Sequence, residues 1–226
     1  MNFKTNLSLI LAAVFSITML SSLTAQEVPD NLTLIGTCEY DSNGNLIHEK
    51  TQEGEYWFEY NSNGKVIHSR IQDEWEERET WNEYDSQGRL VYQKYTGGES
   101  RYEYDLKAHT ITEYSSTDSS WKYDCDSNWN KLHGTNGTIS YWAEYDSNGN
   151  QTLYRTMDGF KIVYEYDSQN RLVKKSEDNN TYITYYEYDK DGKLFHEHSN
   201  YDSDVWYSYT YWENGKVKER KQYSAQ

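Results

Sequence analysis

The chain has 226 residues and a formal net charge of −15, with 37 acidic residues against 22 lysines and arginines. An acidic surplus of this size argues against binding to nucleic acid, because phosphates are held by clustered lysine and arginine. It also disfavours anionic membrane surfaces. The mean hydropathy is −1.07, yet the chain carries 24 Tyr and 8 Trp. Since disordered chains are poor in aromatic residues, we expect a folded chain with a core built largely of tyrosine.

The first predicted element is a signal peptide over residues 1–25. Lys4 precedes an apolar stretch, residues 7–20, that is short for a membrane span, and Ala25 suits a cleavage site. A retained N-terminal anchor is the alternative. We therefore predict export to a periplasmic, outer-surface or secreted location, with no transmembrane segment in the mature chain. Residues 26–38 are predicted to form a lead-in, and residues 39–223 a single repeat domain.

One tripeptide, Glu-Tyr-Asp or once Glu-Tyr-Asn, dominates the rest of the chain. With two worn copies at residues 122–124 and 211–213, its tyrosines recur every 19 to 24 residues. That period is typical of a repeated supersecondary unit. The tyrosines of the seven clear copies are Tyr40, Tyr60, Tyr84, Tyr104, Tyr145, Tyr166 and Tyr188.

Each copy is predicted to be a β-hairpin. Before the turn, Tyr56, Phe58 and Tyr60 alternate with other residues, as in a half-buried strand. An Asp or Asn then caps the turn, a Gly takes a positive φ, and an aliphatic residue opens the second strand. Asn170 holds the glycine slot in one copy. The turn residues are Asp41, Gly44, Asn61, Gly64, Asp85, Gly88, Asp146, Gly149, Asp167, Asp189 and Gly192.

The middle of the array is irregular. Ala108 replaces the glycine that should follow Tyr104, and Trp129 lies in a segment of uneven spacing. The two cysteines of the mature chain, Cys38 and Cys125, either pair in an oxidising compartment or stay free. We predict an all-β fold: about nine antiparallel β-hairpin repeats of 20–24 residues each, forming a curved or spiralling sheet.

At residues 84–90 and 158–167 the sequence resembles the YD-repeat family of bacterial Rhs-type proteins and teneurins. The shared pattern is Tyr-Asp-x-x-Gly-Arg-Leu followed by Gly and Tyr-x-Tyr-Asp, and the resemblance covers residues 36–220. It implies a spiralling β-sheet in an exported protein. With nine repeats and no toxin domain in the sequence, we expect neither a closed cocoon nor toxin delivery. Aromatic hairpins such as Tyr56-Trp57-Phe58 are also similar, more weakly, to choline-binding repeats of cell-wall proteins.

Metal and catalytic motifs are weak. Turns such as residues 41–45 resemble calcium loops, but Gly is fourth rather than sixth and strands flank the turn. His196 and His198 are a candidate metal pair without an evident third ligand, and the variable slot of His48 and His68 predicts a solvent-facing position. Carboxylates are too abundant to mark a catalytic pair, and no nucleophile or phosphate-loop motif occurs. We predict a chain that is not an enzyme and has no catalytic, cofactor or metal residues.

Tryptophans give the best functional indication. We expect five of them to lie on the face opposite the repeat tyrosines, where aromatic rings suit sugar binding; the competing interpretation is a second packed face of a curled sheet. The predicted function is an exported, non-catalytic structural or binding module at the bacterial cell periphery, with a carbohydrate or cell-wall binding module as the alternative. A surface glycan or another exported protein is the expected partner. The five residues are Trp57, Trp75, Trp81, Trp142 and Trp206.

Overall fold

The computed structural model describes residues 28–202 and 204–225, so the predicted signal peptide lies outside the described residues. Eighteen strands make up this part of the chain. They are β1 (Thr33–Tyr40), β2 (Leu46–Thr51), β3 (Gly54–Tyr60), β4 (Val66–Asp73), β5 (Glu77–Tyr84), β6 (Leu90–Tyr95), β7 (Gly98–Asp105), β8 (Thr110–Ser115), β9 (Trp121–Cys125), β10 (Lys131–Thr135), β11 (Ser140–Tyr145), β12 (Gln151–Thr156), β13 (Lys161–Tyr166), β14 (Leu172–Glu177), β15 (Tyr182–Tyr188), β16 (Leu194–Ser199), β17 (Val205–Tyr211) and β18 (Val217–Ser224). Strand β1 thus begins inside the predicted lead-in.

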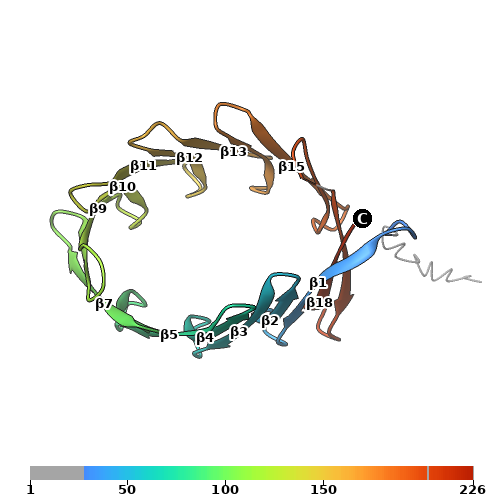
Figure 1. Ribbon diagram of the computed structural model, residues 1–226, viewed down its shortest axis with the longest axis horizontal. Coiled ribbons are helices and arrows are strands. Elements are labelled where there is room, and N and C mark those ends of the chain that lie inside the picture. The colour runs from blue at the N-terminus through green and yellow to red at the C-terminus, as the bar shows by residue number, and fades with distance from the viewer. Residues whose placement is uncertain (1–27, 203, 226) are drawn as a thin grey trace, which may run out of the picture.

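The strands form one closed antiparallel barrel. Each strand pairs with its neighbours in the chain, and β1 also pairs with β18, where Cys38 lies opposite Arg220. Figure 1 shows the resulting ring, with β1 and β18 side by side. The all-β prediction is confirmed, but the predicted curved or spiralling sheet is wrong because the sheet closes. Closure removes the two edges of unpaired backbone groups that an open sheet would leave.

The hairpin turns all lie at one rim of the ring, because successive strands run in opposite directions. This Asp-turn rim consists of residues 41–45, 61–65, 85–89, 105–109, 126–130, 146–150, 167–171, 189–193 and 212–216. The connecting rim at the other side holds the turns between hairpins and, where Thr33 pairs with Ser224, both described chain ends. The predicted positive φ is present at the turn glycines, for example 84° at Gly149, and Asn170 in the same slot has 63°.

The fifth hairpin follows a different phase from the predicted one. Its turn starts at Asp126, whose carboxylate accepts the N–H groups of Asn128 and Asn130, both at 2.9 Å. Cys125 therefore stands in the tyrosine slot, and Trp129, with a φ of 66°, stands in the glycine slot. The predicted worn copy at residues 122–124 is displaced by two residues. With this correction the spacing of the fifth copy becomes regular.

The fourth turn lacks the glycine and is one residue longer than the other turns, counted between the residue in the tyrosine slot and its partner on the next strand. Tyr104 pairs with Ile111 without the register shift found in most other hairpins, so the turn gains one residue. The positive φ, 53°, moves to His109. Ala108 is therefore not forced into the left-handed region, and its Cβ carries no strain there.

The repeat tyrosines lie on the inner wall. Side chains alternate between the two faces of a sheet, and the strand register places Cys38, Ile111, Tyr123 and Tyr207, all buried, on the tyrosine face. A concave wall crowds its side chains, which identifies this face as the inner one. Burial raises the pKa of three tyrosines of the same wall, Tyr141, Tyr186 and Tyr209, to about 12.

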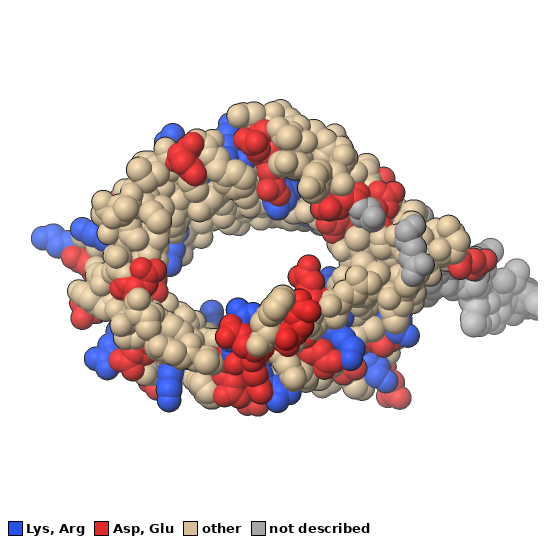
Figure 2. Space-filling view, viewed as in Figure 1, with Lys and Arg blue, Asp and Glu red and all other residues tan. Residues whose placement is uncertain are grey.

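Charged side chains are spread around the outside of the ring. Figure 2 shows acidic and basic residues along its outline and an opening through its centre. Within residues 28–202 and 204–225, the structure has no helix that is long and apolar enough to span a bilayer.

Candidate functional site

In most hairpins a tyrosine hydroxyl bonds the hairpin to the one before it. Tyr188 donates a hydrogen bond from its hydroxyl to the backbone carbonyl of Leu172 at 2.8 Å, and Tyr60 donates to that of Leu46 at 2.7 Å. Equivalent bonds link four further repeats. In the last hairpin Tyr209, two residues before the repeat position, makes the bond to Leu194. These hydroxyls therefore hold neighbouring hairpins together.

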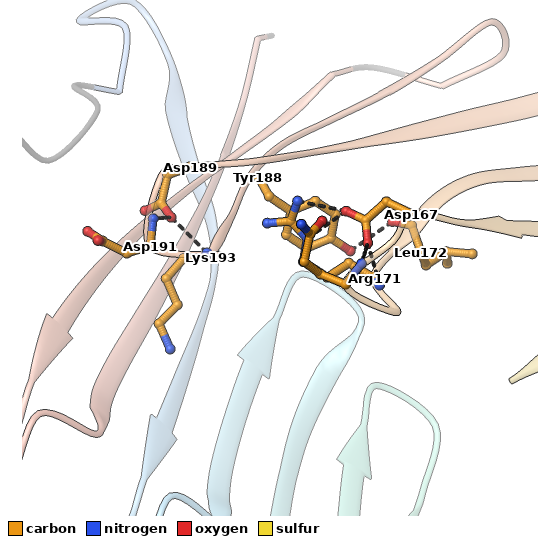
Figure 3. A network of polar contacts seen from close by, with 8 residues as sticks. Asp167, Arg171, Leu172, Tyr188, Asp189, Asp191 and Lys193 are labelled. Atoms are coloured by element: carbon orange, nitrogen blue, oxygen red, sulfur yellow. Dashed lines mark hydrogen bonds and ion pairs between the residues drawn. The ribbon is translucent and has the colours of Figure 1, made fainter. Parts of the chain in front are cut away.

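The turn aspartates are likewise engaged by the chain itself, as Figure 3 shows for Asp167 and Asp189. Asp167 accepts the backbone N–H groups of Gln169 and Arg171 and, at 2.7 Å, the Nε–H of Arg171. The Arg171 guanidinium lies 4.6 Å from the ring centre of Tyr188. The backbone N–H of Arg171 is the main reason that the pKa of Asp167 lies below its ordinary value. These carboxylate oxygens act as turn caps, which favours the turn interpretation over a calcium loop.

The candidate metal pair forms part of a stacked array on the outer wall. The rings of His196 and His198 stack at 5.3 Å. Glu187 lies beside both, with Oε2 3.1 Å from Nδ1 of His196 and Oε1 3.8 Å from Nε2 of His198. No group of three or more metal-ligating side chains suited to an ion occurs in the described part of the chain.

Four cross-strand ladders on the outer wall were missed by the sequence analysis. In the first, Glu39, His48, Trp57 and Arg70 lie opposite one another across β1 to β4. The rings of His48 and Trp57 stack at 5.3 Å, and the Arg70 guanidinium lies 3.9 Å from the centre of Trp57. The signal in the sequence is a carboxylate nine residues before each histidine. The other ladders are Glu59–His68–Trp81–Lys94, Asp124–His133–Trp142–Arg155 and Glu187–His196–Trp206.

These ladders decide which tryptophans are accessible to a ligand. Trp57, Trp81 and Trp142 each lie between a histidine on one neighbouring strand and a cation on the other. The ring of Trp206 stacks on His196 at 3.9 Å. Four of the five candidates are thus stacked on neighbouring side chains, although 39% of Trp81 remains exposed. His48 and His68 lie on the outer wall, where the stacks leave 24% and 22% of their side chains exposed.

Trp75 differs from the other four. It lies in the connecting turn between β4 and β5, and 83% of it is exposed. The turn itself is held firmly, because Asp73 accepts the backbone N–H groups of Trp75 at 2.8 Å and Glu76 at 2.9 Å. Arg78 pairs with the second oxygen of Asp73 at 2.6 Å. The exposed indole of Trp75 is therefore carried by a turn whose backbone is held by hydrogen bonds.

Trp75 and Trp57 line a hollow of about 820 Å³ between the β2–β3 and β4–β5 turns, the Trp75 hollow. Its wall also carries the amides of Gln52 and Gln72 and an ion pair between Lys50 and Glu55. Most of the lining is polar or charged, and Tyr56, Trp57 and Trp75 supply the aromatic surface. This hollow is the best candidate site in the described chain.

The two cysteines are free thiols and do not pair. Cys38 is fully buried at the seam between β1 and β18, where Arg220 donates a hydrogen bond to its sulfur at 3.1 Å. Burial raises the pKa of both the Cys38 and the Cys125 thiol. A buried thiol held in its neutral form is a poor nucleophile.

Three solved structures show weak likenesses to the chain. No protein-family model and no curated relative matches it. A porin-like protein from Bacteroides uniformis is 12% identical with a TM-score of 0.46, over 86% of this chain and 98% of the other. The TcdB2-TccC3-TEV crystal structure is 14% identical with a TM-score of 0.39, over 84% of this chain and 13% of that one. The Photorhabdus luminescens Tc holotoxin pore is 12% identical with a TM-score of 0.33, over 80% and 13%. None assigns a family or a function.

Proposed function

We propose that the chain is an exported, non-catalytic ring protein of the bacterial cell periphery that binds a carbohydrate in the Trp75 hollow. The observation that supports this is the 83% exposure of Trp75 on a turn anchored by Asp73. An exposed indole leaves a large apolar surface in water, and stacking on the C–H face of a sugar removes that surface from water. The anchored turn lowers the entropic cost of binding.

The proposal extends to the type of repeat and to export. The combination of a tyrosine that bonds the previous hairpin, an aspartate that caps the turn and a positive-φ glycine supports repeats of the YD type. The charged residue and apolar stretch before Ala25 support a signal peptide. A mass spectrum of the protein recovered from host fractions tests both cleavage and compartment.

Binding to another exported protein is a second candidate function. The connecting rim exposes Ile139, Met157 and Tyr201, by 51%, 60% and 69%, in three different turns. Ile139 and Met157 line one hollow, and a shared apolar surface of this kind favours a protein partner. Under this alternative, substitution of Met157 impairs complex formation, whereas substitution of Trp75 does not.

The experiment that tests the carbohydrate proposal is a screen of the purified mature protein on a glycan and peptidoglycan panel, followed by fluorescence titration. Trp75→Ala is expected to weaken binding by about tenfold or more, equivalent to about 1.4 kcal/mol. Met157→Ala is the matched control, because it truncates another exposed apolar residue on the same rim. Retention of no glycan, or equal affinity of Trp75→Ala and the parent protein, would refute the proposal.

A further inference from the structure

A second hollow, on the inner wall, shares part of its lining with the Trp75 hollow. The inner hollow is lined by Ile35, Glu49 and Gln222 from β1, β2 and β18. The two hollows share four residues at the end of the β2–β3 hairpin, which are Thr51, Gln52, Glu53 and Tyr56. One surface therefore runs from the exposed indole over the connecting rim and into the ring.

The ring is wide enough to receive an extended ligand along that surface. Eighteen strands spaced about 4.8 Å apart give a perimeter of roughly 86 Å and a backbone diameter of roughly 27 Å. Antiparallel barrels of about this many strands retain an open channel. Figure 2 shows the opening in a space-filling view, so the described side chains do not fill it.

The charges along the surface select against an anionic ligand. Only two cations, Lys50 and Arg78, line the two hollows, and both already pair with carboxylates. Five carboxylates line the same surface, and a ligand charge of the same sign would be repelled by them. They are Glu49, Glu53, Glu55, Asp73 and Glu74.

We propose that the ligand is a neutral, linear oligosaccharide or polysaccharide that runs from Trp75 over the β2–β3 turn into the ring. This inference rests on the proposed function. Short sugars fill only the Trp75 hollow. Longer chains follow the Tyr56 ring, which lines both hollows, and add a contact with Gln222, which lines only the inner one. The inner hollow adds the amide of Gln222 to the Gln52 amide and the Tyr56 ring, which both hollows share.

The test uses cello-, chito- and malto-oligosaccharides of two to eight sugar units, titrated against the mature protein. Within the series that binds, affinity is expected to rise with length by about tenfold or more. Gln222→Ala should reduce the affinity for the longest chain by about threefold to fivefold, the loss of about one hydrogen bond, and leave the shortest unchanged. Lys221→Ala is the matched control, because the neighbouring side chain in β18 points to the outer wall, where it pairs with Glu219 at 3.4 Å.

The outcomes separate this inference from the proposed function. Affinity that does not change with length, or equal effects of Gln222→Ala and Lys221→Ala, overturns the inference and leaves the Trp75 hollow as a sugar site. Absence of binding by every member of the three series overturns the inference, and the proposed function falls with it if the glycan and peptidoglycan panel also retains nothing. A cyclic malto-oligosaccharide adds a further test, since it lacks an end that can enter the ring. It should bind no better than the shortest linear chain, and affinity equal to the longest chain would contradict entry.

Discussion

The two rims of the ring differ in how regular their turns are. On the Asp-turn rim, turn after turn uses a carboxylate or amide oxygen to accept two backbone N–H groups, as at Asp41, Asn61 and Asp167. On the connecting rim the turns differ in length and composition, and one of them presents Trp75. The repeated residues therefore build the ring, and the proposed site uses residues that vary between repeats.

The last turn of the Asp-turn rim departs from this rule where the ring closes. Trp212 stands in the aspartate slot and donates its Nε1–H to the backbone carbonyl of Tyr40 at 3.1 Å. Asn214 donates to the carbonyl of Ser42 at 2.8 Å. These contacts join residues 172 positions apart in sequence, so the final hairpin has exchanged a turn cap for a bond to the first hairpin.

The largest expected effect comes from Trp212→Asp, which gives the last turn the residue found in most other turns. If turn capping decided stability, this variant would be more stable than the parent. We expect it instead to lose about 2 kcal/mol, because a large half-buried side chain and an inter-hairpin hydrogen bond are removed. Urea unfolding measures the loss.

Asn61→Asp is the control for this substitution. It also introduces the common turn residue, but away from the seam, and we expect a change within about 0.5 kcal/mol. A Trp212→Asp protein with frayed β1 and β18 edges should also associate, since unpaired strand edges pair between copies. Light scattering that shows an unchanged mass together with unchanged stability would contradict the seam assignment.

A smaller effect is expected from removal of a single tyrosine hydroxyl on the inner wall. Tyr188→Phe loses the 2.8 Å bond to Leu172, which should cost about 1 kcal/mol. Tyr145→Phe is the matched substitution, because its bond to Lys131 is 3.5 Å long and contributes less. Denaturant midpoints of the two variants check the difference. Equal losses would mean that the hydroxyl bond does not set the contribution of the repeat tyrosine.

The sequence was sufficient for the all-β class because the tyrosine-turn-glycine spacing is local. The same local pattern also contains the correct phase of the fifth turn, since residues 126–130, Asp-Ser-Asn-Trp-Asn, match residues 41–45 apart from the tryptophan. The tripeptide at residues 122–124 resembles the repeat more obviously than the turn at residues 126–130 does, so the prediction followed the tripeptide. A tryptophan with a φ of 66° was not expected, because the left-handed region favours Gly and Asn.

Closure could not be read from the repeat itself. It depends on the pairing of β1 with β18 and on Trp212, a residue that looks like a worn copy in the sequence. The candidate site was predictable only in part for a similar reason. All five tryptophans have the same chemistry, and cross-strand neighbours such as His48 and Arg70 decide which rings are covered. Strand register, which is not visible in one strand alone, supplies those neighbours.

The smallest expected effect is on the loss of stability at low pH. It distinguishes the contribution of a turn residue's charge from the contribution of its hydrogen bonds to the backbone. The pKa of Asp167 lies below its ordinary value, mainly because of the Arg171 backbone N–H, as does that of Asp85 beside Arg89. The unfolded chain therefore takes up protons at a higher pH than the folded ring. The stability from these carboxylates is complete above an ordinary aspartate pKa of about 4 and is lost as the pH falls through the lower folded values.

Asp167→Asn tests that expectation. The amide oxygen can still accept the two backbone N–H groups, as Asn61 does from Asn63 and Lys65 at 3.0 Å, but it does not titrate. The fall in Tm between pH 7 and pH 3 should therefore be smaller in this variant than in the parent, although its Tm at pH 7 is lower because the charged contact with Arg171 is lost. If the variant showed the same fall, the acid sensitivity of the ring would have to come from carboxylates outside this turn. The Asp-turn rim would then be a set of backbone caps whose charge is incidental.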